Sequence, residues 1–288
     1  MKFLLCIVLF ITGSLAHAQL VDDGLSPYER HTHGFQISGA YNASNVLYCS
    51  AEAKAKHIPQ ALSNDTVLKA LTSGHFVTVD QEITDINNVI SRALQTLSFF
   101  GDAKTQNRYV CVGFYQDKGN HMGNALSLVH GYLIFDYKLI ENLYALPDDK
   151  RTFWVQNFLI LHEFAHQLQY WNNDEEVLKT LKGEQSSKKP ELAADCTAAA
   201  LLKLMNLGLP QEVYDLSFKG VIGAAELLGD FDKESPSHHG TPVERQFAAS
   251  YGSGYISQLQ NDLSMGRITV SSQSILRECN KFVNENLY

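Results

Sequence analysis

The chain has 288 residues, 45% of them hydrophobic, and a formal net charge of −8 at pH 7. This acidic balance argues against a protein that binds nucleic acid or adheres to an anionic membrane surface. The length and the ordinary composition favour a folded protein with one large domain, and two domains would also fit the length.

The N-terminal residues 1–18, "MKFLLCIVLFITGSLAHA", have the pattern of a secretory signal peptide. A single lysine precedes an apolar run, and the segment ends in the small-x-small sequence Ala16-His17-Ala18. The apolar run is shorter than the roughly 20 residues that a bilayer span needs. We therefore expect cleavage, export to the periplasm or the medium, and no stable membrane insertion afterwards. The mature chain, 19–288, is expected to be a single domain.

The first half of the mature chain contains one clear helix and two clear strands. Residues 84–101 carry apolar side chains at helical spacing and end in a glycine. Residues 107–116 and 131–136 are rich in β-branched and aromatic residues, which is typical of strands, and the second strand passes into a short helix.

The second half is dominated by helices. Residues 148–171 predict a long helix with Asp148 or Asp149 as its cap, and a polar connection follows with room for a short helix. Residues 190–208 predict a second long helix that has a proline in its first turn and a glycine as its stop. In the tail, residues 234–255 predict a loop followed by a helix. Helices that follow a small sheet predict an α+β fold rather than a doubly wound parallel sheet.

Four cysteines remain after removal of the signal peptide. An exported protein can form disulfides, and the sequence cannot choose among the three possible pairings. No C-x-x-C pair is present, so neither a thiolate zinc site nor thioredoxin-like chemistry is favoured. The alternative is that some of the cysteines are buried thiols that act as small hydrophobes, and Cys196, in the middle of an alanine-rich helix, is the first candidate for this. The four are Cys49, Cys111, Cys196 and Cys279.

The segment "LILHEFAHQLQYW", residues 159–171, contains the motif H-E-x-x-H. His162 and His166 are four residues apart and would lie on one face of a helix, where both can reach one zinc ion. Glu163 is offset by about 100° and can take a proton from a zinc-bound water. Chance produces this motif in roughly one sequence in fifty of this composition, so alone it also fits a buried helix with hydrogen-bonded histidines.

The next long helix offers the missing ligand. Glu191 and Asp195 in "KPELAADC" are again four residues apart, so their carboxylates point the same way. One carboxylate can bind the metal while the other accepts the free ring N–H of a ligand histidine. The small residues around them allow two helices to approach closely. The two segments together predict a site for one catalytic Zn²⁺.

The combination "HEFAHQLQ…ELAADC…HHGTPVERQF" resembles the gluzincin metallopeptidases, in particular secreted or membrane-associated neutral zinc metallopeptidases of bacteria. The resemblance covers about residues 124–255, and the motif-bearing core is about 84–255. It implies a helix-rich zincin-like domain, with His162, His166 and Glu191 as zinc ligands and Glu163 as general base. It also implies Asp195 as the partner that orients a ligand histidine.

The same resemblance implies residues for substrate binding. Asn124 and Ala125 would lead to Gly131 and Tyr132, which begin an edge strand above the zinc. An extended peptide could pair with this strand through its main chain. His130 stands where a small or apolar residue is expected, so this sequence departs from the family pattern there.

The segment "SHHGTPVERQF" resembles the family's downstream segment with a histidine and an arginine. A side chain of either kind that faces the zinc could stabilise the oxyanion of the tetrahedral intermediate. The spacing favours His239 over His238, and Arg245 is the matching arginine that would contact substrate. The alternative is that both histidines lie in an exposed loop.

The first functional hypothesis is an exported zinc endopeptidase that hydrolyses peptides or unfolded proteins with a zinc-activated water. The alternatives are a non-catalytic binding protein with the same fold and a zinc amidase acting on cell-wall peptides. The intact Glu163 argues against the binding protein, because such a protein has no use for a base beside the metal. The sequence does not indicate the natural substrate or the oligomeric state.

Overall fold

The computed structural model describes residues 36–37, 47–48, 75–78, 80–106, 108, 110–116, 125–128, 131–136, 139, 150–181, 187–229 and 239–287. The predicted signal peptide at 1–18 and the pairing of Cys49 lie outside these residues. So do Asn124 and His238, and only the backbone of Tyr132 is described.

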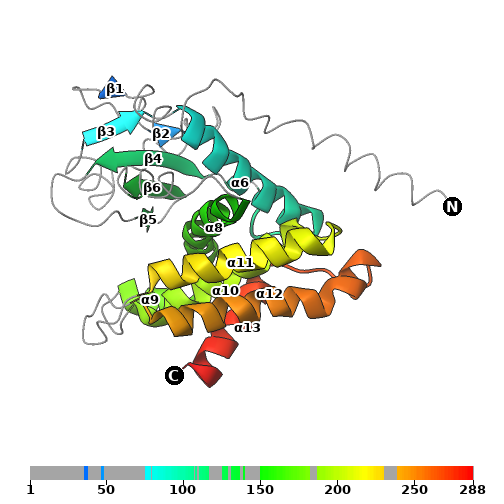
Figure 1. The fold of residues 1–288 in the computed structure, drawn as a ribbon. Helices are drawn as coiled ribbons and strands as arrows, with labels where there is room; N and C mark the ends of the chain where they lie inside the picture. The colour runs from blue at the N-terminus through cyan, green and yellow to red at the C-terminus, as the bar shows by residue number, and fades with distance from the viewer. Residues whose placement is uncertain are drawn as a thin grey trace.

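The described strands pair in a sheet at one end of the molecule (Figure 1). Its order is β1-β3-β4-β6-β5, with β2 also paired to β4. β4 is parallel to β6 and antiparallel to β3, and β5 is antiparallel to β6. The strands are β1 (Gln36–Ile37), β2 (Leu47–Tyr48), β3 (His75–Thr78), β4 (Cys111–Gln116), β5 (Ala125–Leu128) and β6 (Tyr132–Asp136).

The strand order corrects one expectation. The strand predicted at 131–136 is present as β6, but it lies between β4 and β5. Both of its edges are therefore paired, and it cannot receive a peptide through its main chain. The terminal strand of the described sheet on this side is β5, Ala125–Leu128.

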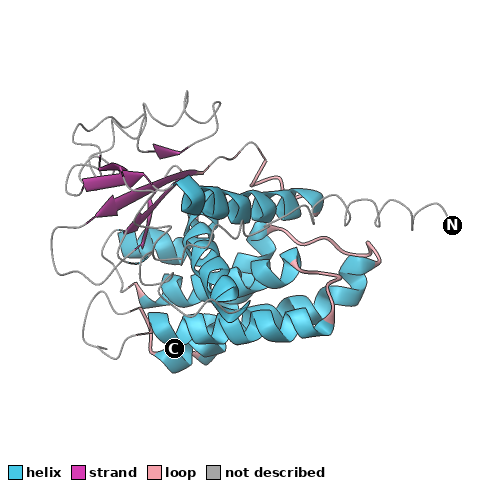
Figure 2. Ribbon diagram, turned by 45° about the horizontal axis from the view of Figure 1, so that its top comes forward, coloured by secondary structure: helices cyan, strands magenta, loops and turns pink. Residues whose placement is uncertain are grey.

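Helices make up most of the described structure, so the helix-rich character predicted from the sequence is confirmed (Figure 2). α10 packs against α8, α12 and α13, and α11 packs against α8 and α12. The helices are α6 (Asp80–Phe99), α8 (Lys150–Asn172), α9 (Glu175–Leu181), α10 (Lys188–Met205), α11 (Gln211–Leu228), α12 (Pro242–Ser264) and α13 (Ser272–Asn286).

The helix α8, which carries "HEFAH", is held by one apolar face. Phe158, Leu161, Ala165 and Leu168 lie three or four residues apart, and all are fully buried. This spacing places them on one side of a helix, as the sequence predicted. The long helix predicted at 148–171 therefore exists with bounds that differ by one or two residues.

The helices α10 and α12 pack at unusually short range because their facing residues are small. A Cβ atom added to Gly252 of α12 would lie 1.9 Å from the carbonyl oxygen of Cys196 on α10. Ala248 and Ala249, one turn earlier on α12, are fully buried. The alanines of α10 that were predicted to allow a close approach are also buried: Ala193, Ala194, Ala198, Ala199 and Ala200.

Cys196, the first candidate for a buried thiol, is not one. It forms a disulfide with Cys279, which ties α10 to α13 across a sequence separation of 83 residues. Cys111 is also disulfide-bonded. Cys196 was misjudged because its alanine-rich surroundings resemble those of a buried thiol, whereas its partner lies on a distant helix.

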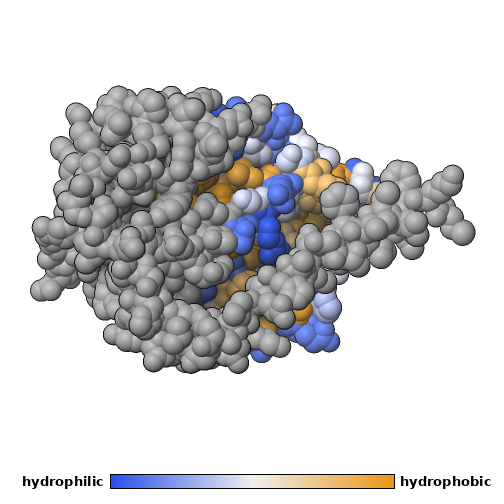
Figure 3. All heavy atoms as spheres, turned by 90° about the horizontal axis from the view of Figure 1, so that it is seen from above, coloured by the Kyte–Doolittle hydropathy of each residue, from blue (hydrophilic) through white to orange (hydrophobic). Residues whose placement is uncertain are grey.

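Within the described residues, no helix combines the length and the apolar character needed to cross a membrane. Seen from above (Figure 3), a group of hydrophilic residues lies between hydrophobic ones on the coloured part of the surface. The described surface on this side is therefore mixed in polarity.

Candidate metal centre

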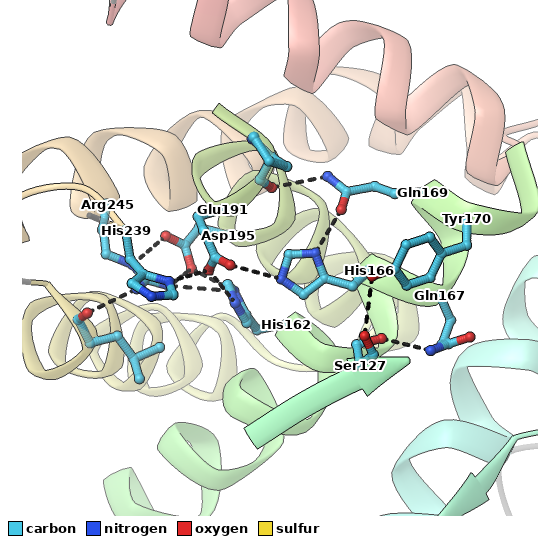
Figure 4. A network of polar contacts seen from close by, with 12 residues as sticks. Ser127, His162, His166, Gln167, Gln169, Tyr170, Glu191, Asp195, His239 and Arg245 are labelled. Atoms are coloured by element: carbon cyan, nitrogen blue, oxygen red, sulfur yellow. Dashed lines mark hydrogen bonds and ion pairs between the residues drawn. The ribbon is translucent and has the colours of Figure 1, made fainter. Parts of the chain in front are cut away.

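Two imidazoles from α8 and one carboxylate from α10 converge at one point (Figure 4). The rings of His162 and His166 lie one turn apart, with their centroids separated by 4.9 Å. Glu191 lies in the first turn of α10, directly after Pro190. Each of the three residues offers one ligand atom, and these atoms all lie within 4.8 Å of one another.

The contacts show which atoms face the centre. Nε2 of His162 lies 3.1 Å from Oε2 of Glu191, and Nε2 of His166 lies 3.5 Å from Oε1 of the same carboxylate. Two imidazole nitrogens and one carboxylate oxygen are a donor set typical of catalytic zinc, which leaves one coordination position open. This trio could hold a metal ion, and its donor atoms fit zinc, which stays a prediction from the sequence.

Asp195 fixes the ring of His162. Its Oδ1 lies 2.9 Å from His162 Nδ1, and its side chain is fully buried. An ionised carboxylate only accepts hydrogen bonds, so Nδ1 is the donor and Nε2 faces the centre. The predicted hydrogen bond between Asp195 and a histidine of the H-E-x-x-H motif is therefore present.

The charges around these groups favour an ionised Asp195 and a protonated His162. Burial is the largest single influence on Asp195 and raises its pKa, but the charge of Arg245 and the bond to His162 together hold that pKa below the ordinary value. For His162, burial alone would lower the pKa, yet the bonds and charges of Asp195 and Glu191 raise it to about 10. Metal binding must displace this proton.

Arg245 has a different place from the one expected. Its side chain is buried, with Nε donating to Asp195 Oδ2 at 2.6 Å and Nη2 to Oδ1 at 2.8 Å. Nη1 donates to the carbonyl of Leu228 at 2.9 Å. The guanidinium is thus directed at Asp195 and the end of α11, not at a substrate. The prediction of a substrate contact is corrected on these contacts.

His239 lies beside Glu191 in the candidate metal centre, and its side chain is partly exposed. Its Nδ1 is 3.2 Å from Glu191 Oε2, and its side chain is 40% exposed. The hydrogen bond to Glu191 raises the pKa of His239. Of the residues predicted in this segment, His239 is brought to the ligands.

The backbone after His239 explains its position. Gly240 has a positive φ of 104°, which favours glycine, and an added Cβ would lie 2.8 Å from a side-chain carbon of Leu192. Thr241 then caps α12 in a capping box with Glu244, whose carboxylate also accepts from Lys188 at 2.7 Å. This turn is thereby attached to the first turn of α10.

Glu163 is half-buried beside the two histidines. Burial raises its pKa above the ordinary value, although the charges of His162 and His166 act in the opposite direction. Glu191 behaves differently. Burial would raise its pKa, but the charge of His166 and the bonds from the histidines around it hold the pKa well below the ordinary value. The two carboxyls are thus distinct, with Glu191 anionic and Glu163 closer to a proton-transfer role.

The residues predicted to bind substrate divide between β5 and β6. The N–H of Gly131 donates to Oε1 of Gln167 on α8, at 3.0 Å, so this amide is already bonded within the protein. Ala125 begins β5, the terminal strand of the sheet on this side. The hydroxyl of Tyr170 donates to the carbonyl of Ser127, which attaches β5 to α8.

Two glutamines of α8 were missed by the sequence reading. Gln167 and Gln169 are fully buried, and each has hydrogen bonds to residues outside α8. Nε2 of Gln167 donates to Ser127 Oγ at 2.7 Å, whereas Gln169 contacts His166 and Pro190. The available signal was the pair of glutamines in "HQLQ", directly after the second histidine of the motif.

Comparisons with known proteins found no matching family model, no matching curated protein and no matching solved structure.

Proposed function

We propose that this chain is an exported zinc-dependent metallopeptidase. The observation that carries the proposal is the convergence of His162, His166 and Glu191 within 4.8 Å, with Glu163 beside them. The expected zincin-like domain and the resemblance to gluzincins are part of this proposal. The substrate would be a peptide or an unfolded protein.

Zinc, when bound by these three residues, would supply a Lewis acid that polarises the scissile carbonyl and lowers the pKa of a water. Glu163 accepts the proton of the attacking water and passes it to the leaving amine. The pKa raised by burial supports this role, because a general base works best when its pKa approaches the working pH.

His239 is proposed to donate a hydrogen bond to the developing oxyanion. Its partial exposure and its position beside Glu191 support this role, because the side chain can face both the ligands and an incoming substrate. Arg245 is proposed to act indirectly: it donates two hydrogen bonds to Asp195, and Asp195 orients His162.

An extended substrate is proposed to pair with β5. This strand ends the sheet on the side next to α8, and Ser127 within it is bonded to two residues of the helix that carries the histidines. Main-chain pairing with an edge strand gives affinity with little sequence preference.

Export to the periplasm or the medium is supported by the signal-like residues 1–18 and by the disulfide between Cys196 and Cys279. Disulfides persist in oxidising compartments and are rare in reducing ones.

The test is cleavage of casein or a labelled peptide by wild type and by Glu163→Gln, with zinc content measured in both. We expect a loss of about 10²- to 10⁴-fold in Glu163→Gln with zinc retained, which is the range for removal of a general base. Glu175→Gln is the matched control, because it makes the same chemical change at an exposed carboxylate of α9.

Undiminished activity in zinc-loaded Glu163→Gln would contradict the general-base assignment. A wild-type protein without bound zinc would overturn the proposal. Hydrolysis of cell-wall peptides with no cleavage of casein would favour an amidase that uses the same site.

A further inference from the structure

Gln169 lies on α8 three residues after His166, with its side chain fully buried. Its Nε2 donates to the carbonyl of Pro190 at 3.0 Å, and its Oε1 lies 2.7 Å from His166 Nδ1. Pro190 directly precedes Glu191 on α10. One amide therefore connects the second histidine of α8 with the backbone next to the carboxylate ligand of α10 (Figure 4).

The chemistry of these contacts determines which way the amide points. The carbonyl of Pro190 can only accept a hydrogen bond, so the nitrogen of the Gln169 amide must face it. The oxygen then faces His166. An amide oxygen also only accepts, so Nδ1 of His166 must carry the proton of this bond.

This arrangement fixes what the other ring nitrogen can do. With the proton on Nδ1, a neutral His166 has its lone pair on Nε2, which points to Glu191 Oε1 at 3.5 Å. Histidine binds metals through an unprotonated nitrogen, and a partner on the other nitrogen sets the tautomer and the ring orientation. For His162 this partner is the charged carboxylate of Asp195. For His166 it is the neutral amide of Gln169.

We propose that Gln169 is the positioning residue of the metal site, holding His166 in its Nδ1–H tautomer and at a fixed distance from the helix of Glu191. The inference rests on the proposed function for the identity of the ion. The tautomer itself is a property of the metal-free chain.

The test compares Gln169→Met with Gln167→Met. Methionine is similar in length to glutamine but lacks the amide, so both substitutions remove hydrogen bonds with little change of volume. Gln167 is the matched control because it is equally buried, lies on the same helix and also has hydrogen bonds to residues outside α8. Its amide is hydrogen-bonded to Ser127 and Gly131, whereas the amide of Gln169 is hydrogen-bonded to His166 and Pro190.

We expect Gln169→Met to bind zinc about 10- to 100-fold more weakly than wild type in competition with a chelator, which is the usual effect of losing such a partner. Gln167→Met should lose similar stability in urea and keep its zinc affinity. Proton–nitrogen correlation spectra of the imidazoles should show the Nδ1–H proton of His166 in wild type and its loss of protection in Gln169→Met.

Equal zinc affinities of Gln169→Met and wild type would overturn the proposal, as would an equal loss in Gln167→Met. If Gln169→Met does not fold, the wild-type spectrum still decides, since a His166 protonated only on Nε2 contradicts the proposed tautomer. If wild type binds no zinc, the proposed function fails, while the spectra of the metal-free protein continue to test the role of Gln169.

Discussion

Replacing Asp195 with asparagine should weaken both the fold and the metal site, for separable reasons. The carboxylate is fully buried; Oδ1 accepts from His162 and from Nη2 of Arg245, and Oδ2 accepts from Nε of Arg245. An asparagine has one oxygen and one NH₂ group in the same place. With its oxygen in the place of Oδ1, the asparagine still accepts from His162 and from Nη2 of Arg245, but its NH₂ group then faces Nε of Arg245, which also needs an acceptor.

The structure gives the size of each loss. Arg245 is only 2% exposed, so removal of its counter-charge leaves a buried cation, which typically costs about 3–5 kcal/mol of unfolding free energy. An asparagine oxygen can still accept from His162, but the negative charge beside the ring is gone, so zinc binding should weaken at the lower end of the usual range of about 10- to 100-fold, which is roughly 1.4–2.7 kcal/mol.

The assay separates the two losses by adding a second substitution. Urea unfolding of the metal-free protein gives stability, and chelator competition gives zinc affinity. In Asp195→Asn with Arg245→Met the buried cation is gone, so stability should recover in part while zinc affinity remains low. Wild-type stability and zinc affinity in Asp195→Asn would refute the reasoning, as would recovery of zinc affinity in the double variant.

Three further predictions concern the framework around the site. Replacement of both Cys196 and Cys279 by alanine should lower the unfolding free energy by about 4.5 kcal/mol, because their disulfide closes a loop with a separation of 83 residues. A change below about 1 kcal/mol in urea titrations would contradict this. Gly252→Ala should destabilise by about 1–3 kcal/mol or more, since the new Cβ meets the backbone oxygen of Cys196 at 1.9 Å, and a midpoint equal to wild type would show that α10 and α12 can separate at no cost. Burial raises the pKa of Glu244, but the bonds from Lys188 and the cap together hold it below 4.5, so its contribution is present above that pH and lost as pH falls through the folded-state value. Wild type should therefore exceed Glu244→Gln in urea midpoint at pH 7, and the gap should narrow as the pH is lowered below 4.5; a constant gap would contradict the pH dependence.

The two pairs of candidate site residues were predictable because helical spacing determines each pair. His162 and His166 are four residues apart, as are Glu191 and Asp195, and a helix places such pairs on one face whatever the rest of the fold does. The helices themselves were indicated by apolar periodicity and by Pro190. Both pairs therefore lie on helices in the structure, as predicted.

The predictions that were wrong concern contacts between segments that are far apart in the sequence. The residues of a single strand do not determine its neighbours in the sheet. The sequence therefore led to the wrong prediction that β6 is the edge strand, whereas β5 lies at that edge. The partner of Cys196 lies 83 residues away, and the direction of Arg245 depends on how α12 packs on α10. Local pattern carries no information on these pairings.

The elements α11 and α13 were also not predicted. α13 begins with a capping box formed by Ser271 and Ser274, in which both residues are serine and the usual glutamate or glutamine at the second position is missing. Gln169 was overlooked for a different reason. Glutamine is common in helices, so its type and position gave no signal. Only the structure shows that Gln169 is fully buried and hydrogen-bonded to His166 of the candidate metal site.

The central claim is that His162, His166 and Glu191 hold one catalytic zinc ion, and the most direct measurement is zinc content with X-ray absorption at the zinc edge. The account predicts one zinc per chain, with nitrogen and oxygen scatterers at about 2.0–2.1 Å, and loss of the metal in Glu191→Ala. Sulfur scatterers at about 2.3 Å, full zinc occupancy in Glu191→Ala, or a wild-type protein without zinc would contradict it.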